Sequence, residues 1–175
     1  MILPSSNLKS INVVFDDQNL VANAGLLAIA TLSQGLGLCE LIQEKVSLSG
    51  RTGGTNPGRK ILTLVHAMTA GAGYIDHVDM LRSGSTEAVL GHVAMAPSTI
   101  GTFLRAFTFG HLRQLDSVTD AALSRAWAMG AGPDHAQLVI DIDSTICEVH
   151  GTNKQGANFG YTKCRCYHPL IAVRG

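Results

Sequence analysis

Apolar and polar residues follow two different periods along this chain, and the period changes near residue 132. Before that point apolar residues recur every three or four positions, which is typical of amphipathic helices. Beyond it they alternate with polar residues, which is typical of strands. A short strand is also expected over residues 11–15. The pattern predicts helices over residues 20–32, 38–46, 57–68, 74–81, 86–90, 99–109 and 112–129.

One helix has a clear start signal and a clear apolar stripe. Asn56 and Pro57 are expected to cap and open it, because proline is preorganised for the first helical position. His66 lies off the stripe and is expected at the surface. The predicted core face consists of Ile61, Leu64, Val65 and Met68.

Residues 85–109 have the pattern of two short helices joined by a break. A helix capped by Ser85, a break over residues 91–97 and a second helix capped by Ser98 indicate a helix-turn-helix unit, whose second helix enters the major groove of DNA. An ordinary helical hairpin packed in the core fits the same pattern. In the first interpretation, the residues that face DNA are Ser98, Thr99, Thr102 and Arg105.

The segment 138–149 is rich in β-branched residues and follows a glycine-proline turn, so it is predicted to be a strand. Its acidic face carries Asp141, Asp143 and Thr145, because alternate residues share a face. The opposite face is apolar apart from Ser144, and its members are Leu138, Ile140, Ile142 and Ile146.

Two carboxylates two residues apart on a buried strand are costly unless a partner neutralises them. A hard divalent cation is the usual partner, and Mg²⁺ typically binds one or two carboxylates together with phosphate oxygens and water. Asp141 and Asp143 are therefore candidate metal ligands for phosphoryl-transfer chemistry. Alternatively, the strand ends at Asp141, and residues 143–145 form a turn or a helix cap.

Composition and charge narrow the function classes. Of 175 residues, 46% are hydrophobic and 15% are charged, so a buried core is expected. The formal net charge of +0 argues against a strongly basic nucleic-acid binder but permits local basic groups. No apolar run has the length of a membrane span, and no signal peptide or secreted cysteine framework is present, so a cytoplasmic location is expected. The basic groups are Arg51, Arg59 and Lys60, and then Lys154, Lys163, Arg165 and Arg174.

Several blocks in residues 138–172 resemble the start of the catalytic domain of bacterial insertion-sequence transposases of the DDE class. The resemblance is closest to the family numbered thirteen-eighty in the insertion-sequence naming. Residues 13–17 and the helical region are also similar to the N-terminal part of that family, less specifically. The blocks are VIDIDST at 139–145, VHG at 149–151, KQGA at 154–157, GY at 160–161 and YHPLIA at 167–172.

The resemblance implies an α+β fold. A mostly helical, DNA-binding region over residues 1–132 would precede the first strands of a truncated ribonuclease H-like catalytic domain over residues 133–175. Asp143 is the position that matches the first member of the Asp-Asp-Glu metal triad, and Asp141 is the alternative. The complete enzyme is expected to use Mg²⁺ or Mn²⁺ and to act on the inverted repeats of its insertion sequence.

The family's second aspartate and its glutamate lie further along the chain than Gly175, so the sequence is expected to be a fragment without cleavage activity of its own. Its last strands are expected to expose apolar surface and unpaired edges. Two alternatives remain open. One is a regulatory DNA-binding fragment that associates with the full-length transposase. The other is a helical protein-interaction module that forms homo-oligomers.

Overall fold

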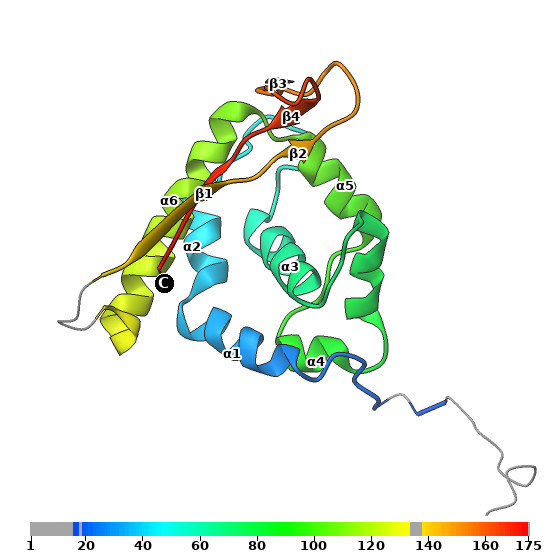
Figure 1. Cartoon of the computed structure of the whole chain (residues 1–175). Coiled ribbons are helices and arrows are strands. Elements are labelled where there is room, and N and C mark those ends of the chain that lie inside the picture. The colour runs from blue at the N-terminus through cyan, green and yellow to red at the C-terminus, as the bar shows by residue number, and fades with distance from the viewer. Residues whose placement is uncertain (1–15, 18, 134–137, 175) are drawn as a thin grey trace, which may run out of the picture.

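The computed structural model describes residues 16–17, 19–133 and 138–174 (Figure 1). The strand expected over residues 11–15 lies outside these residues. A group of helices contains about half of the described residues, and a long bent ribbon of strands follows it. The helices are α1 (Leu26–Gly35), α2 (Leu38–Lys45), α3 (Pro57–Thr69), η2 (Ile75–Arg82), α4 (Thr86–Leu90), α5 (Pro97–Arg105), α6 (Phe109–Ala126) and η3 (Trp127–Ala131). The strands are β1 (Ile140–Ser144), β2 (Cys147–Glu148), β3 (Asn158–Phe159), β4 (Arg165–Tyr167) and β5 (Leu170–Arg174).

The helices follow the predicted order, and the last predicted helix, over residues 112–129, is divided into α6 and η3. The other differences lie at the helix ends. The first helix begins at Leu26 rather than residue 20, because residues 22–25 form turns and Leu26 N–H donates to the Asn23 carbonyl. The predicted cap at Ser98 is wrong. Ala96 holds that place, since Pro97 occupies the first helical position and the residue before a proline favours extended backbone.

The apolar side chains bury themselves in three neighbouring clusters. The largest joins α1, α3, η2, α4 and α5, with Val78, Leu81 and Ile100 almost fully buried. A second lies between α2 and α6 around Ile42 and Val118. The third packs Phe103 of α5 against the segment between α2 and α3. Helix α5 is therefore fixed from two sides.

The predicted core face of α3 is correct only in part, because Ile61 and Leu64 pack against the core but the fully buried side is centred on His66. This histidine is fully buried, whereas Met68 is 69% exposed. Its Nδ1 lies 3.0 Å from Nε2 of His92, and its Nε2 lies 3.4 Å from Oγ of Ser33. These partners come from the α4–α5 link and from α1, so α3 turns its histidine toward polar groups that can satisfy it.

The His66 pair makes stability depend on pH. Burial, and then the neighbouring His92, lower the pKa of His66 from 6.5 to about 4. The unfolded chain therefore binds an additional proton between these values, so this contribution to stability is complete above pH 6.5 and is lost as the pH falls toward 4. The loss is expected to reach about 3 kcal/mol.

Urea unfolding at pH 7 and at pH 4.5 measures this effect. His66→Gln should remove most of the difference between the two conditions, and the exposed His150→Gln should leave it in place. An unchanged pH dependence in His66→Gln would show that another group carries it.

The strands form one antiparallel ribbon with a break. Ser144 lies opposite Leu170 before the break and Cys147 lies opposite Tyr167 after it, so the register is the same on both sides. Thr145 N–H donates to the Pro169 carbonyl across the break. The strand predicted over residues 138–149 is thus present as β1 and β2. Strand β3 adds to β4 at the far end.

The α+β class is confirmed, but the burial of the acidic strand that the metal argument assumed is not observed. Every residue of β1 is exposed on both faces, and β1 contacts no described element except β5. Ile142 is 64% exposed and Leu170 is 73% exposed. The expected apolar exposure of the last strands is therefore observed. The division into domains at residues 132 and 133 stays a prediction.

The length and apolar character of the helices were compared with those of a membrane-spanning helix. Within the described ranges, no single helix is long and apolar enough to cross a bilayer, and α1 with α2 reaches that length only as a pair bent by 57°. Leu41 and Ile42 of that pair are buried in the helical core.

Candidate functional site

The two candidate carboxylates lie on the open ribbon. Asp141 pairs with Val173 and Asp143 pairs with Ile171, so the acidic face of β1 continues as an apolar face on β5. The two aspartates are two residues apart on a strand, so they share that face and their Cα atoms lie roughly 7 Å apart. Asp143 Oδ1 accepts a hydrogen bond of 2.7 Å from Ser144 N–H, which fixes one of its oxygens at the end of β1.

This donor set fits part of a magnesium site. Mg²⁺ commonly takes only one or two carboxylates and completes its shell with phosphate oxygens and water. Two exposed aspartates on one face supply that minimum. However, the described residues contain no group of three histidine, cysteine or acidic side chains that converge on one point. A full triad therefore requires residues beyond those that the structure describes.

The predicted DNA-facing residues lie on α5, and three of the four share one side of it. Thr102 Oγ1 donates to the Ser98 carbonyl at 3.0 Å, and Arg105 Nη2 donates to Thr102 Oγ1 at 3.4 Å. Thr99 lies about a quarter turn away and is only partly exposed. The structure thus assembles Ser98, Thr102 and Arg105 into one polar stripe.

The helices around this stripe are short. Helix α4 has five residues, and the link from Leu90 to Pro97 turns on Gly91, whose φ is 71°. Glu87 Oε1 accepts from Ala94 N–H and holds the link against α4. Two helices with a tight link are compatible with both the helix-turn-helix and the helical-hairpin interpretation, and the DNA-facing role of α5 stays a prediction.

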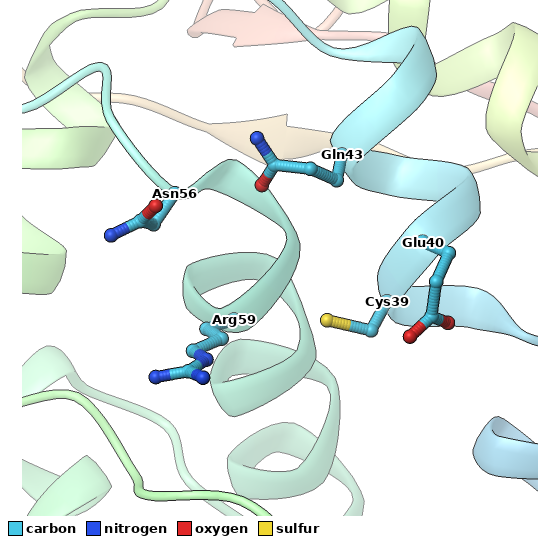
Figure 2. Close-up of a pocket in the computed structure, with 5 residues that line it drawn as sticks. All are labelled: Cys39, Glu40, Gln43, Asn56 and Arg59. Atoms are coloured by element: carbon cyan, nitrogen blue, oxygen red, sulfur yellow. The ribbon is translucent and has the colours of Figure 1, made fainter.

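A separate pocket of about 350 Å³ lies between α2 and the start of α3 (Figure 2). Cys39 and Glu40 project from α2, and Arg59 projects from α3 away from both of them. Burial first, and Glu40 second, raise the pKa of the Cys39 thiol, against an opposing effect of Arg59. A protonated thiol is a poor nucleophile, so the pocket does not have the character of a cysteine active site.

The sequence predicts a loop over residues 47–55, but it does not reveal that this loop packs against α5. Lys60 was grouped with surface cations, but its side chain is buried and its Nζ donates to the carbonyls of Gly53 and Thr55. Burial lowers the pKa of Lys60. The signal in the sequence is the run SGRTGGT at 49–55, because adjacent glycines mark turns that need a fixed partner.

Comparison with known proteins identifies the family. A family model described as Transposase DDE domain group 1 matches residues 3–175. No curated protein and no solved structure matches the chain. The family number in the insertion-sequence naming stays a prediction. Since the match spans nearly every residue, including both the helical region and the acidic ribbon, the chain belongs to the group 1 family of transposase DDE domains.

Proposed function

We propose that this chain provides the DNA-binding region and the first catalytic strand of an insertion-sequence transposase, with the terminal inverted repeats as its DNA target. The observation that carries the proposal is the family match across residues 3–175, together with the β1–β5 ladder that displays Asp141 and Asp143. Members of this family act in DNA transposition, have DNA as their partner and typically use divalent metal ions. We propose that this transposition takes place in the cytoplasm.

Asp143 is the proposed first metal ligand, and Asp141 is its neighbour on the same face. When bound, Mg²⁺ or Mn²⁺ would stabilise the attacking and leaving oxygens of the scissile phosphate. The hydrogen bond from Ser144 N–H leaves Asp143 Oδ2 available and holds the carboxylate in one orientation. Such preorientation matters because a ligand that is already fixed loses less conformational freedom when the site forms.

The remaining two carboxylates are proposed to come from further segments that add to the β1–β5 ladder and complete a ribonuclease H-like sheet. The exposed faces and free edges of the ladder support this proposal, because apolar strands of this kind are covered in folded proteins. In their absence the chain would bind DNA without cutting it. The same surfaces would then allow association with a second copy or with the full-length transposase.

Binding to the ends of the element tests the proposal. The 175-residue chain should bind a duplex carrying the terminal inverted repeat at least about tenfold more tightly than a scrambled duplex of equal length. Arg105→Ala should weaken binding to the repeat by about tenfold, because a base-edge or phosphate contact of arginine is lost. Arg82→Ala is the matched control, since Arg82 is paired with Asp79 at 2.8 Å. Equal affinity for both duplexes in a gel-shift titration would count against target recognition.

A further inference from the structure

A polar hollow of about 410 Å³ lies between the segment 47–55 and the C-terminal end of α5. Two arginines from opposite sides line it, Arg51 and Arg105, and no acidic side chain does. The remaining lining residues are Gly50, Thr52, Thr102 and Ala106. Two cations and two hydroxyl groups around one hollow form a donor-rich surface for an anion.

Neither arginine forms a salt bridge with an acidic side chain of the residues that the structure describes. The one salt bridge among the described residues joins Arg82 and Asp79, with nitrogen and oxygen 2.8 Å apart. Arg105 instead folds back along its own helix, with Nη2 donating to Thr102 Oγ1. The C-terminal end of a helix carries partial negative charge, so Arg105 also offsets the field that would otherwise repel an anion there.

The segment that carries Arg51 is held firmly against α5. Lys60 Nζ donates to the Gly53 carbonyl at 2.7 Å and lies 5.3 Å from the centre of the Phe103 ring. Two successive turns, Leu48 to Arg51 and Arg51 to Gly54, place Arg51 between them. The position of Arg51 opposite Arg105 is thus set by buried contacts and not by the surface arginines themselves.

Close backbone contact fixes the same arrangement. Gly53 has a φ of 81°, and a Cβ built there would lie 2.9 Å from Thr102 Cγ2 and 3.2 Å from the Thr102 carbonyl carbon. Only a residue without a side chain allows the segment to sit this near to α5. The segment 47–55 and α5 therefore touch at Gly53 and Thr102 and form the two sides of the hollow. Arg51 lies on one side and Arg105 on the other.

We propose that this hollow binds a phosphodiester group of the DNA backbone, with Arg51 and Arg105 on the phosphate oxygens and the threonine hydroxyls as additional donors. Guanidinium groups bind phosphate through paired hydrogen bonds, and threonine hydroxyls also bind backbone phosphates. The proposal rests on DNA being the partner of the chain, as proposed above. It adds Arg51 and Thr52 to the stripe on α5, and it predicts a contact that does not read the base sequence.

Salt-dependent binding tests the assignment. Affinity of the 175-residue chain is measured by fluorescence anisotropy for the terminal-repeat duplex and for a scrambled duplex at several salt concentrations. Arg51→Gln should weaken binding to both duplexes by the same factor, about five- to tenfold at 0.1 M salt, and should reduce the slope of log K against log salt by about 1. Arg51→Lys should keep most of the slope, and Arg82→Gln should change neither quantity.

The outcomes separate this inference from the proposed function. If the unaltered chain binds neither duplex, DNA binding itself is wrong. If it binds but Arg51→Gln behaves like the unaltered chain, the phosphate site alone is wrong. A free phosphate ion has the same chemistry, so the melting temperature is also measured with 10 mM inorganic phosphate at matched ionic strength. A stabilisation lost in Arg51→Gln, with duplex binding unchanged, would assign the hollow to a free anion and overturn the proposal.

Discussion

Asp143→Ala is expected to reduce DNA strand cleavage by about 10²–10⁴-fold in the transposase that contains these residues, because a metal ligand at the scissile phosphate is worth several kcal/mol of transition-state stabilisation. The side chain is exposed and accepts a hydrogen bond from the adjacent Ser144 N–H, so the fold should be unaffected. Cleavage of end-labelled terminal DNA in Mg²⁺ and in Mn²⁺ measures the loss. Equal melting temperatures of the two proteins verify that folding is intact.

Two companion substitutions define the role of Asp143. Asp116→Ala, on the exposed side of α6, should leave cleavage unchanged. Asp141→Ala should have the smaller effect of the two strand aspartates, because the resemblance places the triad member at Asp143. A reversed order would move the metal ligand to Asp141. Full activity in both variants would remove the acidic strand from the catalytic site.

Phe103→Ala is expected to destabilise the helical region by about 3–5 kcal/mol, the usual cost of removing a large aromatic side chain from a packed core. Phe103 is completely buried, between Leu48 and Ala106, and its ring meets that of Phe107 edge-to-face at 5.0 Å. Lys60 Nζ lies over the same ring. The substitution therefore removes the ring that packs against Leu48 of the segment 47–55. It also removes the ring over which the buried Lys60 ammonium lies.

Urea unfolding followed by circular dichroism measures this loss. Phe159→Ala provides the matched control, because that ring is 70% exposed and its removal should change stability by less than about 0.5 kcal/mol. Where Phe103→Ala remains folded, DNA affinity should also fall, since Arg51 and Arg105 would no longer be held opposite each other. A destabilisation below about 1 kcal/mol would contradict the packing described for α5.

Local signals in the sequence predicted most of the helices. Pro57 starts α3 and Gly91 ends α4. Both effects depend on the backbone preferences of a single residue, so they can be predicted from the local sequence. The orientation of α3 was not predictable in this way. His66 is buried because Ser33 and His92 provide its hydrogen bonds, and these residues lie 33 and 26 positions away. An apolar stripe alone assigns a histidine to the wrong face when its polar partners are distant in sequence.

The ribbon shows the same division between local and distant causes. Alternation correctly assigned Asp141 and Asp143 to one face, because the period of a strand is a local property. Burial of that strand depends on segments that pack across it, and the described chain supplies only β5 beside it. The break between β1 and β2 was also missed, since Pro169 lies opposite Thr145 and has no backbone N–H to donate in return.

Sequencing the gene beyond codon 175 is the most direct test of the claim that β1 and β5 begin a catalytic sheet. The account predicts a reading frame, continuous or restored by a single shift, that encodes a further aspartate and later a glutamate on predicted strands or helices of a ribonuclease H-like domain. Asp143 would then be one of three metal ligands. A stop codon followed by no such segment would contradict a catalytic role for this strand, and the chain would act through DNA binding alone.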